Sequence, residues 1–502
     1  MMSSLYIGAS GMQSHSTGMS VVTNNLANIN TVGYKQNTLL FSDLVSQFLP
    51  AQSNTLTNFS QKGSGVQEGA TRTLFTQMAF ETGSEATDIG IEGIGFFGVT
   101  ANGQTQYTRA GNFRFTKDGY LVTPDGWRLL GHAIVNGQES PATTPVQLDF
   151  SSASGVGRIA PQATTAITAI SQLGGIQDSA VNTDNPFFAL AAAWDGAGSP
   201  PLDSGQYSYA EPLQFYDSSG TLRNATVYYD LAGAQGGQTA VEYLVALDPA
   251  EDASSLAGTR AAGLLMAGTL TFSSTGTLDN LTAFLPPASG NPGNLQEWTP
   301  ASLRDGNPVF SVSPSNGSPQ AISLNMGLTL NGSATSGLAS AAEAAARPEA
   351  IYTPSTAATL QGSASTLYGS SPGSISHQYD GFAEGFLYNT LVSTEGVLQG
   401  RYSNGQTQDL YRIPLYRFVS QDGLRREGSN RFSSTPESGA AQEGAAGTEN
   451  FGTTKEYCLE QSNVDYASEF VTMIITQRGF QMNSKVVTTS DQMLQKALEL
   501  KR

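Results

Sequence analysis

The chain has 502 residues, a length that suggests about three domains and several buried cores. It carries 24 basic and 41 acidic residues, so its formal net charge is −17. Nucleic-acid affinity rests on clustered lysine and arginine, so this balance argues against a phosphate-binding surface, and no nucleic-acid partner is expected. With only 13% charged residues and 55 glycines, the surface is polar and uncharged. That composition is common in extracellular β-rich proteins, although an ordinary solvated surface would have the same composition.

The chain has one cysteine and no membrane-spanning pattern. Cys458 alone cannot form an intramolecular disulfide. The N-terminus lacks the basic patch and apolar run of a cleaved signal, and no stretch approaches the roughly 18 apolar residues that cross a membrane. No membrane insertion is expected, and by themselves these features predict a cytoplasmic protein.

The first thirty residues predict a helix. After a cap at Ser3–Ser4, apolar side chains such as Leu5, Met12 and Met19 recur at helical spacing. The pattern breaks at residues 28–33, which contain asparagines and a glycine.

The last forty residues predict one long helix, from Leu459 to Leu500. Ser462 and Asp465 fit the Ser-x-x-Asp capping pattern at its start. The apolar positions that follow form a narrow stripe, interrupted near Arg478, of the width of a coiled-coil seam. The stripe consists of Val464, Ala467, Val471, Ile474, Met482, Val486, Met493, Ala497 and Leu500. A seam needs a partner, and the N-terminal helix is a candidate; both could also be ordinary core helices.

Between the terminal helices, short apolar runs alternate with turn signals such as Asn102-Gly103 and Asn404-Gly405, the pattern of β-hairpins. The same pattern early and late in the chain predicts one β domain built from both blocks, with a separate β domain inserted between them. The predicted order is an N-terminal helix (1–35), a connecting extended or β segment (36–80), the first part of a β wall domain (81–154), one or more inserted outer β domains (155–375), the second part of the wall (376–457) and a C-terminal helix (458–502).

Two catalytic motifs are matched only in their spacing. Residues 93–98 have the glycine spacing of a dinucleotide-binding turn, but Phe96 and Phe97 continue a strand where a helix should begin, which favours a structural turn. Ser371 lies in a nucleophile-elbow string, and the proline after it prevents the strand–turn–helix that makes such a serine reactive. No cofactor and no catalytic residue is expected.

Histidines and acid pairs give no site either. His15, His132 and His377 lie in different predicted regions, without acidic or cysteine neighbours at metal-ligand spacing. Acid pairs such as Glu81 and Glu85 could hydrolyse a glycoside only if the fold placed them across a cleft. No metal site is expected, and the protein is not predicted to be an enzyme.

Several longer motifs resemble those of the flagellar rod and hook family of bacteria. Residues 24–35 are similar to its N-terminal signature, and residues 464–494, with Gln477-Arg478 in their middle, to its C-terminal one. Two inner blocks, within 88–97 and 107–122, agree with it as well. A block within residues 400–439 resembles the hook members of the family.

The resemblance implies an α+β multidomain fold, in which terminal helices form a coiled-coil-like rod domain beside a mainly-β wall domain and an inserted all-β outer domain. It implies a structural subunit that polymerises with many copies of itself into a curved hollow tube, the hook. Such a tube acts as a universal joint and transmits torque from rod to filament. Implied partners are distal-rod proteins, hook–filament junction proteins and the hook cap, and implied transport is type III export of an uncleaved chain to the extracellular flagellum.

The residues that the helical pattern and the signatures assign to assembly are Leu5, Met12, Met19, Asn24, Asn25, Leu26, Ala27, Asn28, Gly33, Tyr34, Lys35, Ser462, Asn463, Val464, Asp465, Val471, Ile474, Gln477, Arg478, Met482, Val486 and Met493. Two alternatives remain. A distal-rod component shares both ends of the chain, although its middle is usually shorter. A secreted β-rich carbohydrate-binding protein or glycosidase would suit the glycine, serine, threonine and tyrosine content of the middle.

Overall fold

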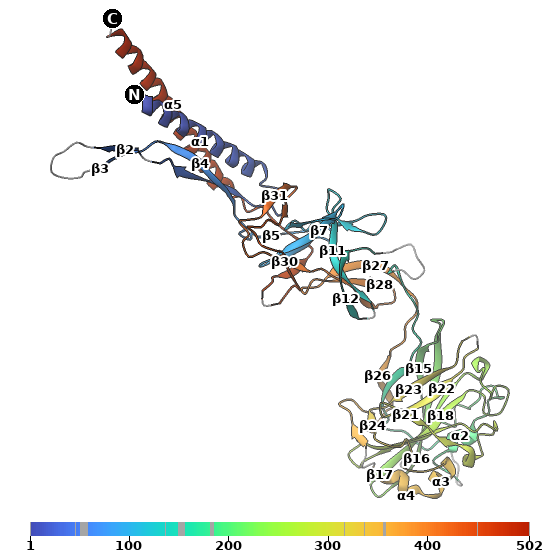
Figure 1. Cartoon of the computed structure of the whole chain (residues 1–502). Coiled ribbons are helices and arrows are strands. Elements are labelled where there is room, and N and C mark those ends of the chain that lie inside the picture. Colours follow the sequence, from blue (N-terminus) through green and yellow to red (C-terminus); the bar gives the residue numbers. More distant parts are fainter. Residues whose placement is uncertain are drawn as a thin grey trace. The chain divides into compact units, whose positions relative to one another are not determined.

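A computed structural model of the chain divides into two compact units. The first unit comprises Met1–Arg158 and Phe386–Arg502, and the second Ile159–Gly385 (Figure 1). The structure describes residues 2–45, 47–50, 59–135, 137–148, 156–180, 185–315, 317–335, 337–354, 358–448 and 450–500. The predicted boundary between residues 154 and 155 and residues 51–58 of the predicted connecting segment lie outside these ranges. The predicted fold class is confirmed, because helices at both termini accompany a body built mainly of strands.

Helices α1 (Met2–Ala27) and α5 (Tyr466–Glu499) pack side by side in the first unit (Figure 1), and we call them the helix pair. The prediction that the two ends of the chain pack together is confirmed. Two predicted caps are wrong. Helix α1 has already begun before Ser3–Ser4, and the N-cap of α5 is Asp465, whose carboxylate accepts a hydrogen bond from the Ser468 amide at 2.7 Å. Ser462 lies outside α5, in the segment that leads to it.

At the seam of the helix pair, glycines of one helix face larger side chains of the other. A Cβ added to Gly8 would lie 2.8 Å from Val487, and one added to Gly479 would lie 2.5 Å from the ring of His15, so both glycines are required by the close approach of the helices. The predicted apolar stripe is not this seam. Val471, for example, is 56% exposed. The close approach depends on a glycine opposite each larger seam side chain, and most of the predicted stripe points to other faces of α5.

A β-ribbon follows α1. Strand β1 (Asn37–Asp43) pairs antiparallel with β4 (Val66–Thr73), and β2 (Gln47–Pro50) pairs with β3 (Phe59–Lys62) beyond them. The ribbon lies against α1 through a hydrogen bond of 2.6 Å from the Thr17 hydroxyl to Glu68.

The rest of the first unit is a wall of strands from both halves of the chain. Strand β7 pairs with β30 and β8 with β32, which brings together segments some 320 residues apart. The wall strands are β5 (Phe80–Thr82), β6 (Ile89–Glu92), β7 (Phe96–Ala101), β8 (Gln104–Thr108), β9 (Arg114–Phe115), β10 (Leu121–Val122), β11 (Arg128–Val135), β12 (Gln138–Pro145), β13 (Arg158–Ile159), β27 (Gly385–Val392), β28 (Val397–Tyr402), β29 (Thr407–Arg412), β30 (Leu415–Arg417), β31 (Arg425–Gly428), β32 (Arg431–Ser433), β33 (Gln442–Gly444), β34 (Thr453–Glu456) and β35 (Cys458–Glu460). Phe97, Leu398 and Leu415 are fully buried in its main core.

The second unit contains a six-stranded sheet, ordered β15-β16-β17-β18-β19-β20, and a five-stranded sheet, ordered β21-β22-β23-β14-β26. Alternate residues of the larger sheet enter two cores: Val245 packs toward the five-stranded sheet, and Leu244 toward the short helices. The predicted boundary after residue 375 falls within β26. The elements are β14 (Ala166–Gln172), α2 (Ala189–Ala193), β15 (Tyr209–Tyr216), β16 (Leu222–Gln235), β17 (Gln238–Leu247), β18 (Leu264–Phe272), β19 (Leu278–Leu285), β20 (Thr299–Pro300), β21 (Ser302–Arg304), β22 (Asn307–Val312), β23 (Gln320–Asn325), β24 (Leu328–Leu330), α3 (Ala341–Ala346), α4 (Pro348–Tyr352), β25 (Ala358–Leu360) and β26 (Gly373–Tyr379).

Candidate functional site

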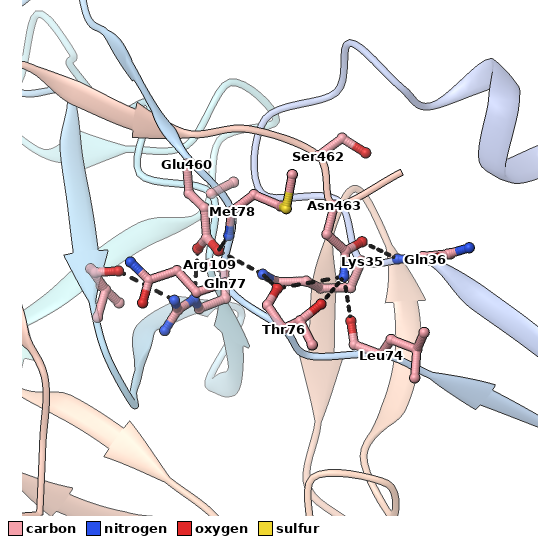
Figure 2. Close-up of polar contacts among 12 residues, drawn as sticks. Lys35, Gln36, Leu74, Thr76, Gln77, Met78, Arg109, Glu460, Ser462 and Asn463 are labelled. Carbon is pink, nitrogen blue, oxygen red and sulfur yellow. Dashed lines mark hydrogen bonds and ion pairs between the residues drawn. The ribbon is translucent and has the colours of Figure 1, made fainter. Parts of the chain in front are cut away.

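Three charged side chains are buried together where the helix pair meets the wall, and we call them the joint cluster: Lys35, Arg109 and Glu460 (Figure 2). Lys35 Nζ lies 2.7 Å from Glu460 Oε1, and Arg109 Nε lies 2.9 Å from Glu460 Oε2. The side chains of Lys35 and Glu460 are 0% exposed and that of Arg109 is 5% exposed. One carboxylate thus binds two cations from segments far apart in the sequence.

Lys35 belongs to the loop after α1, and its ammonium group also donates to the Thr76 carbonyl at 2.8 Å. The Met78 amide donates to Glu460 Oε1 at 3.3 Å, so the chain between β4 and β5 is held to the same carboxylate. Burial lowers the pKa of Lys35, and nearby Arg109 lowers it further, while Glu460 opposes both. Removal of the Glu460 charge would therefore leave two buried cations without a counterion.

Arg109 holds the glycine turn of residues 93–95. Its Nη1 donates to the carbonyls of Gly93 and Gly95, each at 2.8 Å, and its Nη2 donates to the Ile91 carbonyl at 3.2 Å. Gly93 has a φ of +99° and Gly95 a φ of +152°, a backbone path that only glycine follows without strain. The motif with dinucleotide-like spacing is therefore a turn between strands β6 and β7 that wraps a guanidinium group.

Asn463, at the approach to α5, ties the same region together through its amide. Its Oδ1 accepts a hydrogen bond of 2.6 Å from the Gln36 amide, and its Nδ2 donates to the Leu74 carbonyl at 2.8 Å and to the Thr76 hydroxyl at 3.0 Å (Figure 2). The two segments that flank the β-ribbon are thereby fixed to the start of α5.

Asn25, near the C-terminal end of α1, makes the corresponding hydrogen bonds from the other helix. It exchanges two hydrogen bonds with the backbone of Asn37, at 3.0 and 2.8 Å, and its Nδ2 also donates to Glu469 of α5 at 3.1 Å. The Tyr34 hydroxyl donates to Asn24 at 3.0 Å. Side-chain amides therefore end α1, start β1 and align α5 in one network.

The sequence-predicted assembly residues fall into three classes of burial. The buried ones, which the structure brings together at the joint, are Asn25, Gly33, Tyr34, Lys35, Ser462, Asn463 and Val464. The half-buried ones are Leu5, Met12, Met19, Leu26 and Asn28. The exposed ones are Asn24, Ala27, Asp465, Val471, Ile474, Gln477, Arg478, Met482, Val486 and Met493. Of the last class, Asn24 still reaches the joint through its hydrogen bond with Tyr34.

Sequence reasoning missed Arg109, Glu460 and Glu469 as site residues. All three are charged and buried, in a chain with only 13% charged residues. The available signal for Glu469 was its place, since it is the acidic residue in the first turn of α5, and the helix that packs against α5 contains no Asp, Glu, Lys or Arg.

The described residues offer little for other chemistry. No group of three or more histidine, cysteine, aspartate or glutamate side chains within them could hold a metal ion. In the same ranges, none of the helices has the length and apolar character needed to cross a membrane. In the joint cluster, Glu460 pairs with Lys35 and Arg109, and Arg109 also binds backbone carbonyls, so the cluster links the segments that join the helix pair to the wall.

Comparison with known proteins agrees with this geometry. Family models match four segments: flagella basal body rod protein (residues 5–35), flagellar hook protein FlgE/F/G D1 domain (90–176), flagellar basal body protein FlaE D2 domain (189–382) and flagellar basal body rod FlgEFG protein C-terminal (457–500). The flagellar hook protein FlgE of Borreliella burgdorferi is 30% identical over 527 aligned residues, which cover 100% of both chains. The chain belongs to the flagellar hook protein FlgE family.

A second curated relative agrees over the same span. FlgE of Treponema pallidum is 30% identical, with 100% of both chains covered. The crystal structure of Helicobacter pylori flagellar hook protein FlgE2 aligns with 76% of this chain and 100% of its own, at a TM-score of 0.42 and 12% identity. The resemblance to the rod and hook family is confirmed, and this FlgE-family chain is a structural subunit of the bacterial flagellar hook.

Proposed function

We propose that the chain assembles into the tubular hook through its helix pair, and that the joint cluster carries force between that pair and the β wall. The observation that carries this proposal is an exposed apolar face on α5. We call it the outer stripe: Val471, Ile474, Ile475, Met482, Val486 and Met493. Ile475 is 63% exposed and Met482 66%. Contiguous apolar surface of this kind marks an interaction site, because water-exposed apolar area is costly.

Copies of the same chain are the occupant that suits the outer stripe. The seam with α1 runs through Thr476, Gly479 and Ser490 on a neighbouring side of α5, so most of the stripe stays available after the helix pair has formed. A helix with apolar side chains on one face and small residues on another packs against two kinds of neighbour at once. Repetition of the same contact by every subunit then gives a polymer with a closely packed inner layer.

The joint cluster makes the helix pair and the wall one mechanical body. Glu460 accepts from both Lys35 and Arg109, and a buried ion pair has strict geometry because any displacement leaves a charge unpaired. Torque delivered to the wall therefore reaches the helices through hydrogen bonds that cannot slide without that penalty. In contrast, the β-ribbon beside α1 carries exposed Leu40 and Phe41, and its hydrogen bond from Thr17 to Glu68 is exposed to solvent, which suits contacts that exchange during bending.

The second unit is proposed as an outer addition that polymerisation does not need. Its entry and exit strands pair with one another, since Gln162 and Phe382 exchange backbone hydrogen bonds of 2.9 and 3.0 Å. Their closeness lets a short glycine–serine bridge replace the unit. The six-part division, with helices at 1–35 and 458–502, wall parts at 81–154 and 376–457, the connection at 36–80 and the insertion at 155–375, is proposed on the same grounds.

The remaining parts of the proposal follow from the family. The chain is exported to the cell exterior without a cleaved signal, acts with distal-rod proteins, hook–filament junction proteins and the hook cap, and has no enzymatic activity.

Electron microscopy and sedimentation of the purified full chain test the assembly proposal. We expect tubes above a critical concentration. A variant without residues 1–30 and 465–502 should fold with a cooperative transition and stay monomeric at every concentration. Monomers alone from the full chain, or tubes from the truncated one, would overturn the proposed role of the helix pair.

A further inference from the structure

One buried carboxylate of the helix pair has no counterion. Glu469, in the first turn of α5, is 3% exposed. Its Oε1 accepts hydrogen bonds from the side-chain amides of Asn25 and Gln36, but its Oε2 has no hydrogen-bond partner. Within the described ranges, no lysine, arginine or histidine lies within ion-pair distance of it. A buried charge normally binds an opposite charge or a metal, because desolvation is otherwise uncompensated.

The carboxylate lines a small cavity between the helix pair and the β-ribbon. The cavity has a volume of about 150 Å³. It is lined by Gly18, Val21, Val22 and Asn25 of α1, by residues 36–39 and Phe41 before and along β1, and by Glu469, Thr472 and Thr476 of α5. Phe41 and Thr472 at its edge are exposed, so the cavity opens to solvent. The Glu469 side chain therefore borders a space of the size that a single cationic side chain can enter.

Helix α5 also carries an exposed positive charge, the sign that Glu469 needs. Arg478 is exposed and makes no ion pair in the part of the chain that the structure describes. On α5 it lies on the face of the outer stripe, between Val471 and Met482 along the sequence. A contact that covers the stripe would therefore bury this guanidinium too, and a buried guanidinium also needs an anion.

Nine residues separate Glu469 from Arg478, which is two and a half helical turns at 3.6 residues per turn. The two charges therefore point to opposite sides of α5, about 13 Å apart along its axis. Opposite charges on opposite faces suit a head-to-tail contact, in which each copy offers its acid to one neighbour and its base to another.

We propose that Arg478 of a neighbouring copy inserts its guanidinium group into the cavity and pairs with the unpartnered oxygen of Glu469. This inference rests on the proposed function, because it requires that copies pack through the helix pair. The guanidinium can also lie on the exposed ring of Phe41 as it enters. Assembly thus neutralises both charges in one step and fixes the axial shift between adjacent helices, a register that the apolar stripe alone leaves free.

A double-mutant cycle on the purified full chain tests the pairing, with critical concentration as the readout. Glu469→Gln and Arg478→Gln should each raise it at least about tenfold, and the double variant should raise it no more than the larger single effect. Lys485→Gln is the matched control, because Lys485 lies on the same face one heptad further along. We expect it to change the critical concentration less than about threefold.

Monomer stability separates this role from a structural one. Glu469→Gln keeps the shape of the side chain and removes an uncompensated buried charge, so the monomer should unfold at the same temperature or a higher one. A lowered unfolding temperature that accounts for the assembly defect would make Glu469 a fold residue and overturn the proposal.

The remaining outcomes of the double-mutant cycle also test the pairing of Glu469 with Arg478. Additive effects in the double variant, or normal assembly of Glu469→Gln, would show that the two groups do not pair. If Lys485→Gln instead were non-additive with Glu469→Gln, the occupant would be Lys485 and the assignment to Arg478 would be wrong. Wild-type chains that never assemble would refute the proposed function itself, whereas wild-type tubes with an additive cycle would refute only the pairing.

Discussion

The joint cluster and the outer stripe both contain residues that the sequence assigned to assembly, such as Lys35 and Met482, yet the fold treats the two regions in opposite ways. Around Glu460 every charge finds its partner within the chain, and the three side chains are almost fully buried. Along the outer stripe large apolar side chains such as Met482 face solvent. A subunit of a polymer must contain both kinds of region, since one completes the monomer and the other completes the assembly.

The difference separates two kinds of mutational effect. Changes in the joint cluster should lower the stability of the monomer, and assembly should fail as a consequence. Changes in the outer stripe should leave the monomer as it is and raise the concentration needed for assembly. The predictions below use monomer stability and the critical concentration for assembly as readouts. A result can therefore contradict the behaviour expected of either region.

Glu460→Gln should have the largest effect. It leaves Lys35 and Arg109 buried without a counterion, a loss that costs about 3–5 kcal/mol in comparable buried pairs. Chemical denaturation of the monomer, followed by a signal of the first unit, measures it. Glu456→Gln, an exposed acid on the adjacent strand, is the control and should change stability by less than about 0.5 kcal/mol. Equal effects of the two variants would show that the cluster does not stabilise the joint.

Val471→Pro should come next and should act on both quantities. Proline in the interior of α5 removes a hydrogen bond and clashes with the preceding turn, at a cost of about 3 kcal/mol or more for the helix. We expect lower helix content by circular dichroism and no tubes. Val471→Ala keeps the helix and tests whether the side chain or the backbone is responsible. Tubes of normal appearance from the proline variant would contradict a continuous helix over Tyr466–Glu499.

Ile475→Ser isolates the outer stripe. Ile475 is mostly exposed, so its loss should change monomer stability by less than about 0.5 kcal/mol. If the stripe is buried between copies, the loss of one apolar side chain costs about 1.5–3 kcal/mol per subunit and raises the critical concentration roughly tenfold to a hundredfold. Thr489→Ser, also exposed on α5, serves as the control for placing a serine on this helix. An unchanged critical concentration would remove the stripe from the interface.

The sequence predicted much of this because its signals were local. Helical spacing located both terminal helices, and turn pairs such as Asn404-Gly405 located the hairpins of the wall. The sequence did not predict which face of a helix packs against which neighbour. Periodicity finds an apolar stripe but not its partner, so Val471 was placed in the seam that Gly8 and Gly479 form.

Only part of the joint cluster could be predicted from the sequence, for a related reason. Lys35 was found through its signature, but its counterion lies 425 residues away and its companion Arg109 in a third segment. No spacing rule connects such residues, because the strands that carry them are paired by the fold. Only the pairing of β35 with β5 brings Glu460 near Thr76 and Met78.

The smallest predicted effect concerns pH and tests whether the wall, like the joint, has its charges paired within the chain. Burial disfavours a charged His132, but its hydrogen bonds to Glu443 and to the Ser140 carbonyl outweigh burial and raise its pKa above the ordinary value. Glu139, nearby, adds to the rise. A group whose pKa is higher in the folded state binds protons more tightly there than in the unfolded chain. Its stabilising contribution is therefore complete below pH about 6.5, the unfolded value, and is lost as pH rises through the folded value.

We expect the first unit to lose on the order of 1 kcal/mol or less across that window, because the pair is only partly buried. Denaturation of the monomer at pH 5.5 and 8.5 measures the loss, and both His132→Gln and Glu443→Gln should remove it. His377→Gln, in the second unit, provides the contrast. Burial lowers the pKa of His377, so its contribution has the opposite sign, and its removal should leave the loss in the first unit in place. A wild-type first unit with equal stability at both pH values would mean that the His132–Glu443 contact adds nothing to the fold, and that the wall is held by its apolar core alone.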